Sequence, residues 1–173
     1  AIKRASGNID QRFDGSPAVA ARLHLAVARA FHGRSDFDTA RAEYVRAEHL
    51  FARANQTGSD DAVIGRLGRI HMEATSGQPE RLEEAGRLLD AERRRLGARG
   101  NSGRAGFALA QAEGAYGYMA DIELAERAFR RAVTIGETNG SDVPPTQLLK
   151  AKSSLALVLM RLGRAKDAEP IAR

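Results

Sequence analysis

The sequence predicts an all-α fold, an α-solenoid of about four antiparallel helical hairpins. Three observations support this prediction. Residues that start and end helices alternate at regular intervals along the 173 residues. No segment shows the alternation of apolar and polar residues that is typical of a strand. A pattern of large and small apolar residues also recurs, and steady recurrence is typical of stacked repeats.

Helix boundaries follow from local residue types. Proline fits the first turn of a helix, Ser, Asp and Asn cap the free amides there, and glycine favours the helix end. These signals predict helices over 17–33, 36–54, 60–76, 79–97, 102–119, 121–138 and 145–162, and from 164 onward. A shorter leading helix over 1–13 would place Ile2, Ile9 and Phe13 on one side.

The second helix of each predicted hairpin carries one stripe of large and small residues. Spacings of three and four place such residues on one helix face. The four stripes are Phe37, Ala40, Tyr44, Ala47; Leu82, Ala85, Leu89, Glu92; Ile122, Ala125, Phe129, Ala132; and Ala165, Ala168, Ala172. Their anchor alanines, at positions 40, 85, 125 and 168, are spaced by 45, 40 and 43 residues. An ordinary bundle has no reason to keep this order at a steady period, so we favour stacked repeats.

These stripes resemble the second helix of a tetratricopeptide repeat. The pairs resembling its first helix are Val27-Ala28 with Phe31, Leu67-Gly68 with His71, Ala112 with Tyr116, and Leu155-Ala156 with Leu159. Glu92 and Glu113 depart from the pattern, because both stand where the family has a small residue. The long period resembles the variety found in kinesin light chains and bacterial regulators. The resemblance implies a leading helix and linker over 1–16, then a right-handed superhelix over 17–173 with units at about 17–58, 59–100, 101–143 and 144–173, the last truncated.

Composition and motifs argue against catalysis. The absence of cysteine excludes disulfides, thiolate zinc sites and cysteine nucleophiles. Neither the four histidines (His24, His32, His49 and His71) nor the glycine-rich segments form a metal or phosphate-loop motif, and His71 falls at a core-type position where we expect a buried, hydrogen-bonded ring. We therefore expect no enzyme, cofactor or metal. The net charge of +5 is mixed along the chain, which disfavours a nucleic-acid face.

The resemblance implies a concave groove lined by the first helices. The expected groove residues are Arg22, Leu25, Arg29, His32, Arg69, Met72, Phe107, Ala110, Gly114, Tyr118, Ser153, Leu157 and Met160. This groove would be basic at one end and apolar at the other, with a low floor at Gly65, Ala110 and Gly114. Arginine can grip a carboxylate with two parallel hydrogen bonds, so we expect the three arginines to contact acidic groups of a partner. The alternative is that they are solvated or pair with local acids such as Glu73.

The leading functional hypothesis is a non-catalytic protein-protein interaction module that binds a peptide or helix, possibly acidic in character. By resemblance it would be the regulatory or sensing part of a larger bacterial signalling protein or transcriptional regulator. One alternative is a domain that senses a small molecule or signal peptide near Phe107, Tyr118 and Met160; a nucleic-acid-binding helical repeat is less favoured. The compartment stays open, with the cytoplasm favoured and the periplasm an option for a part of a membrane-spanning regulator. The last stripe is cut short, so we also expect a homodimer through that end.

Overall fold

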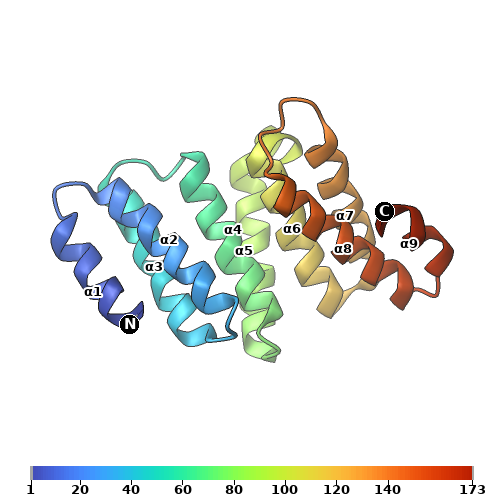
Figure 1. Ribbon diagram of the computed structural model, residues 1–173, viewed down its shortest axis with the longest axis horizontal. Coiled ribbons are helices and arrows are strands. Elements are labelled where there is room, and N and C mark those ends of the chain that lie inside the picture. Colours follow the sequence, from blue (N-terminus) through green and yellow to red (C-terminus); the bar gives the residue numbers. More distant parts are fainter. Residues whose placement is uncertain (1, 173) are drawn as a thin grey trace.

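The computed structural model describes the backbone of residues 2–172 and the side chains of residues 6–171. Within this part the chain forms nine α-helices, one 3-10 helix and no strand (Figure 1). The helices are α1 Ile2–Arg12, α2 Pro17–His32, α3 Phe37–Arg53, α4 Asp60–Thr75, α5 Pro79–Leu96, the 3-10 helix Gly97–Asn101, α6 Gly103–Ala120, α7 Ile122–Glu137, α8 Pro145–Arg161 and α9 Ala165–Ala172. In the described residues we find no helix with the length and apolar character needed to span a bilayer.

The α-helix boundaries agree with the sequence prediction to within one residue, because the local signals act as expected. Asp36, Ser59 and Asp121 cap α3, α4 and α7, each side chain accepting a hydrogen bond from a backbone amide of the first turn. Prolines occupy the first position of α2, α5 and α8. The sequence signals missed the 3-10 helix between α5 and α6.

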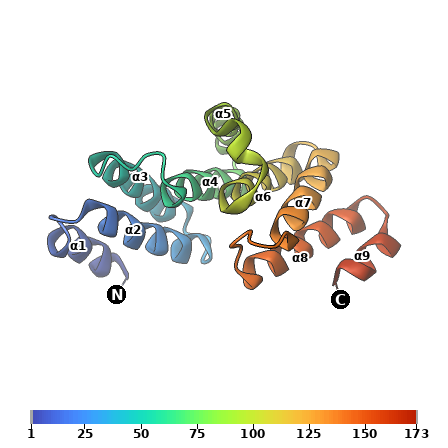
Figure 2. The ribbon, with the colours of Figure 1, turned by 90° about the horizontal axis from the view of Figure 1, so that it is seen from above.

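The helices pack as antiparallel hairpins that stack into an α-solenoid. The hairpins are α2 with α3, α4 with α5, α6 with α7, and α8 with α9. Figure 2 shows that the stack curves into an arch, with α2 and α8 on the concave side, α4 and α6 at the top and α5 projecting on the convex side. At the centre α4 packs directly against α6, so the second and third hairpins are joined mainly through their first helices.

The core follows the predicted stripes. The anchor alanines Ala40, Ala85 and Ala125 are completely buried and Ala168 is nearly so. A small side chain at these points lets a neighbouring helix approach closely, and the large members of the stripes fill the space beside it. Ala165 of the last stripe is exposed.

The predicted apolar side of α1 is present in the part of the helix whose side chains the structure describes. Ile9 and Phe13 pack against the first hairpin. The side chains of Ile2 and Ala172, which we also expected on apolar faces, lie outside the described residues.

Two glutamates occupy buried positions where the repeat pattern has small residues. Glu92 of α5 is 3% exposed, and its carboxylate accepts hydrogen bonds from Arg66 Nε at 2.6 Å and from Arg95 Nη1 at 2.6 Å. Glu113 of α6 is also 3% exposed and lies between Arg93 of α5, with Nε 2.5 Å from Oε1, and Arg131 of α7. Ion pairs between helices thus replace small-residue packing at these two points.

Candidate functional site

The concave side of the arch holds a cleft of about 720 Å³. Helices α4 and α6 form its floor, while α2 and α8 form its sides (Figure 2). The lining residues are Arg29, His32, Gly33, Tyr44, Ile64, Leu67, Gly68, His71, Phe107, Ala108, Gln111, Gln147, Leu149, Lys150, Ser153 and Ser154. Each of the four hairpins contributes through its first helix, so the cleft exists only in the stacked solenoid.

The cleft is positively charged. Arg29 on α2 and Lys150 on α8 are exposed, and neither forms an ion pair with any residue that the structure describes. The lining residues include no aspartate or glutamate. Because a cleft with low-dielectric walls focuses the field of its charges, the two cations make this site attractive to anions.

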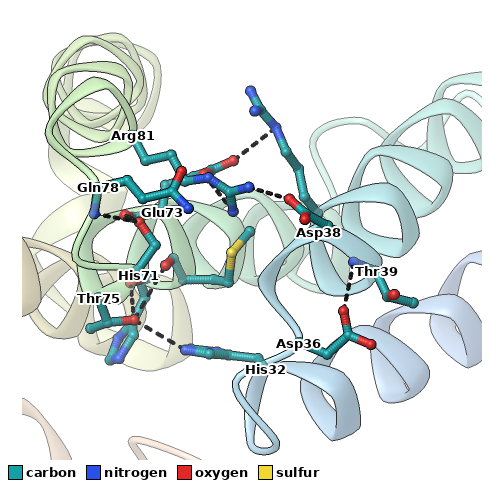
Figure 3. A network of polar contacts seen from close by, with 12 residues as sticks. His32, Asp36, Asp38, Thr39, His71, Glu73, Thr75, Gln78 and Arg81 are labelled. Carbon is teal, nitrogen blue, oxygen red and sulfur yellow. Dashed lines mark hydrogen bonds and ion pairs between the residues drawn. The ribbon is translucent and has the colours of Figure 1, made fainter.

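Two neutral histidines line the wall beside these cations. The ring centroids of His32 and His71 are 5.6 Å apart in an edge-to-face arrangement (Figure 3). The Thr75 hydroxyl donates to the carbonyl of His71, so the Nε2–H of His32, 3.1 Å away, is the donor to the Thr75 oxygen. Burial lowers the pKa of His32, and the charge of Lys150 acts in the same direction.

His71 is held more firmly in its neutral form. Burial lowers the pKa of His71 from 6.5 to about 4; a proton on His32 would lower it further, and the charge of Lys150 acts in the same direction. Its ring is partly buried in the cleft wall and forms no hydrogen bond with the described residues. The expectation of a hydrogen-bonded core histidine is therefore wrong, because the ring packs against His32 and borders the cleft instead.

On the other side of α4, Glu73 forms a separate polar network with Arg41 and Arg81, shown in Figure 3. The Glu73 side chain is fully buried, with Oε1 3.0 Å from Arg41 Nε. Burial raises the pKa of Glu73, and the two arginines oppose that shift. Arg81 also pairs with Asp38 of α3, so this network joins the first two hairpins behind the cleft.

The neutral His71 predicts acid sensitivity. A folded-state pKa below the unfolded value means that the unfolded chain binds the proton more readily, so stability is lost as the pH falls from about 6.5 towards 4. We expect the wild-type protein to lose about 2 kcal/mol more than His71→Gln between pH 7 and about 4.5. Urea unfolding of both proteins at the two pH values measures the difference, and equal losses would contradict it.

The structure brings only part of the predicted site together. Arg29, His32, Phe107 and Ser153 line the cleft. Tyr118 lies elsewhere, with the Arg161 guanidinium 4.8 Å from its ring centroid.

The remaining predicted residues fall outside the cleft or carry other contacts. Met160 and Leu157 are exposed on α8 beyond the cleft, so the expected pocket of Phe107, Tyr118 and Met160 does not form. Two of the three arginines proposed as acid contacts already have acidic partners. Arg22 Nε is 2.6 Å from Asp61, and Arg69 Nε is 3.3 Å from Glu48. Of the three arginines, only Arg29 has no acidic partner among the described residues and can contact an acidic group of another protein.

Several predicted groove residues are buried in the core instead. Leu25 is 3% exposed, and Met72, Ala110 and Gly114 are also buried. The low groove floor expected at the glycines does not form, because core side chains fill the space beside them. A Cβ on Gly65 would lie 2.8 Å from Leu25 Cδ2, and a Cβ on Gly114 would lie 2.6 Å from Phe129 Cε1. These glycines accommodate core side chains and leave no open floor.

The sequence reasoning missed Tyr44, Gln111, Gln147 and Lys150 as cleft residues. Lys150 precedes the predicted Ser153 by three residues and therefore shares its helix face, which is a signal that the sequence did contain. Tyr44 had been assigned to core packing, and only the structure shows that its ring also reaches the cleft past Gly68.

Comparison with known proteins supports the fold. No protein-family model and no curated protein matches this sequence. Among solved structures, BtubC (BKLC) from P. vanneervenii matches with a TM-score of 0.61 and 19% sequence identity, over 90% of this chain. This chain shares the fold of that protein. It spans 61% of that protein's length, and at this identity the likeness concerns the fold alone.

Proposed function

We propose that this chain is a non-catalytic protein-protein interaction module whose concave cleft holds an acidic segment of a partner protein. The observation that carries the proposal is the cleft itself, which all four hairpins line and in which two cations lack an acidic partner. Arginine binds a carboxylate through two parallel hydrogen bonds, and lysine adds a second charge on the opposite side.

The apolar part of the lining suits the rest of such a segment. Ile64 on the floor and Leu149 on α8 offer contact surface for aliphatic or aromatic side chains, while Leu67 and Phe107 also line the cleft but are almost completely buried. Leu149 is 63% exposed, which leaves its side chain free to pack against a bound segment. Binding sites generally combine such apolar walls with a few well-placed polar groups.

The repeat architecture also suggests a wider role. The large–small stripes and the likeness to BtubC support a tetratricopeptide-type repeat of the long-period variety. Bacterial signalling proteins and transcriptional regulators that carry such repeats use them as regulatory parts, and we propose that role here.

Reversing both free cleft cations tests the binding site. We expect Arg29→Glu with Lys150→Glu to weaken binding of a hexaglutamate peptide at least about tenfold, because the two new carboxylates then repel the carboxylates of the peptide. Fluorescence anisotropy measures the peptide, and affinity capture with each protein as bait measures natural partners. Circular dichroism should show unchanged helix content.

The matched control is Arg94→Glu with Lys166→Glu. These two cations are also exposed and form no ion pair with the described residues, but they lie on α5 and α9 outside the cleft. The control should bind as the wild type does. Equal peptide binding and equal partner capture by both double variants would overturn the proposed site.

A small-molecule or signal-peptide sensor is the second candidate, because the volume of the cleft falls within the range of small-molecule sites, about 300–1,000 Å³. A sensor should be stabilised in a saturable manner by a small ligand. Thermal-shift screening distinguishes the two functions, since a module that binds only proteins gives no such response.

A further inference from the structure

One exposed face of α8 carries a row of apolar side chains. The row, called the α8 stripe below, consists of Leu149, Ser153, Leu157 and Met160, whose spacings of four, four and three residues place them on one side of the helix. Its three large side chains are between 48% and 63% exposed. The Ser153 hydroxyl donates to the Leu149 carbonyl of the same helix, so it interrupts the stripe little. Single exposed apolar residues are common, but three on one helix face mark an interaction surface.

The first hairpin shows what covers this face in the solenoid. The repeat pattern places Ser153 and Met160 of α8 where α2 has Leu25 and His32. In α2 both positions contact the next first helix, because Leu25 packs against Gly65 of α4 and His32 hydrogen-bonds to a hydroxyl of α4. Helix α8, in contrast, packs mainly against α7 and α9. The α8 stripe therefore lies where the fold accommodates another helix.

The charges beside the stripe are basic. Helix α8 contains no acidic residue. Lys150 follows Leu149 and Arg161 follows Met160, so the two cations lie about three turns apart on the same flank of the stripe. Both are exposed, and neither forms an ion pair with a residue that the structure describes. Arg161 donates to the Tyr118 carbonyl, which leaves its charge uncompensated. A complementary surface thus combines apolar side chains with acidic ones on that flank.

We infer that the α8 stripe docks an amphipathic helix of a partner protein, whose apolar side covers the stripe and whose acidic residues face Lys150 and Arg161. Proteins recognise such helices through apolar anchors three or four residues apart. Leu149 and Ser153 also line the cleft, so the stripe is continuous with it. The inference rests on the proposed function and deepens it, since the partner segment that places acidic residues in the cleft continues as a helix over α8.

A second copy of this chain fits the stripe less well. Two α8 helices related by a two-fold axis pair antiparallel through their stripes, which brings Lys150 of one copy near Arg161 of the other. Like charges placed together across an interface oppose association. Charge thus favours an acidic helix over a second α8.

Fluorescence anisotropy with two labelled peptides tests the docking. The first is an amphipathic helix of about 18 residues, with a leucine stripe at spacings of three and four, glutamate along one flank and alanine elsewhere. The second has the same composition in an order that breaks the leucine stripe. The wild-type protein should bind the first peptide at least about tenfold more tightly than the second. Leu157→Ser should weaken binding of the first peptide about tenfold, because it removes an anchor from the middle of the stripe.

Val19→Ser is the matched control for Leu157→Ser. Val19 is 40% exposed and lies on α2 outside the cleft, so this variant loses a comparable apolar side chain and should bind the first peptide as the wild type does. Thermal unfolding of both serine variants shows that any loss of binding is not a loss of fold. Lys150→Gln should weaken binding of the first peptide but not of a version with glutamine in place of glutamate.

Equal binding of the two peptides, or unchanged binding by Leu157→Ser, would overturn the inference. A wild-type dimer in sedimentation that Leu157→Ser abolishes would overturn it too, because a second copy then covers the stripe. Hexaglutamate binding separates this failure from a failure of the proposed function. If that binding still depends on Arg29 and Lys150, the interaction module stands and only the docking of a helix on α8 fails.

Discussion

Replacing Glu92 by alanine should destabilise the fold by about 3 kcal/mol, although alanine is the residue that the repeat pattern favours there. Glu92 is 3% exposed, and Arg66 grips it with Nε 2.6 Å from Oε1 and Nη2 3.3 Å from Oε2. The Arg66 side chain is itself only 14% exposed, so the substitution leaves a positive charge buried without its partner. Urea unfolding followed by circular dichroism measures the loss.

Two comparisons isolate the cause. Glu123→Ala removes an exposed pair with Arg127, whose closest N–O distance is 4.0 Å, and should change stability by no more than about 1 kcal/mol. Arg66→Met combined with Glu92→Ala removes both charges and should recover much of the loss of the single variant. If Glu92→Ala is as stable as the wild type, the ion pair does not hold these helices.

The helices could be predicted from the sequence because their signals are local. Asp36, Ser59 and Asp121 cap helices through amides two or three residues ahead, so a few neighbouring residues suffice. Glu92 and Glu113 looked like weak points in the repeat because, apart from Arg95 beside Glu92, their compensating arginines lie elsewhere in the chain. Arg66 precedes Glu92 by 26 residues and sits on another helix, and only the fold brings the two together.

The groove was predicted less well because its lining depends on how the hairpins stack. The repeat pattern assigns an open face to every first helix, including the faces of Leu25 and Met72. In the structure Leu25 packs into the space left by Gly65 of α4, and Met72 joins the same core cluster. Arg29, one turn further along α2 than Leu25, still reaches the cleft. The packing of α2 against α4 thus buries faces of these two helices that the repeat pattern leaves open.

Gly117→Ala should destabilise the fold by about 3 kcal/mol through overpacking. Gly117 lies in α6 where this helix meets the start of α7, and an added Cβ would lie 2.6 Å from the backbone nitrogen of Ala125 and 3.0 Å from its Cα. A flexible side chain could turn away from such a contact, but the backbone of α7 is fixed by its own hydrogen bonds. The two helices would therefore have to separate.

The control for Gly117→Ala is Gly7→Ala, which also replaces a glycine inside a helix. A Cβ on Gly7 meets no atom within 4 Å, so alanine there should leave stability unchanged or raise it by up to about 1 kcal/mol through helix propensity. Opposite signs in urea unfolding would show that close contact decides the outcome. Because Gly117 faces the buried anchor Ala125, the same result would explain why the stripes repeat a small residue at this point: the helix backbones touch there. Equal effects of the two substitutions would contradict that explanation.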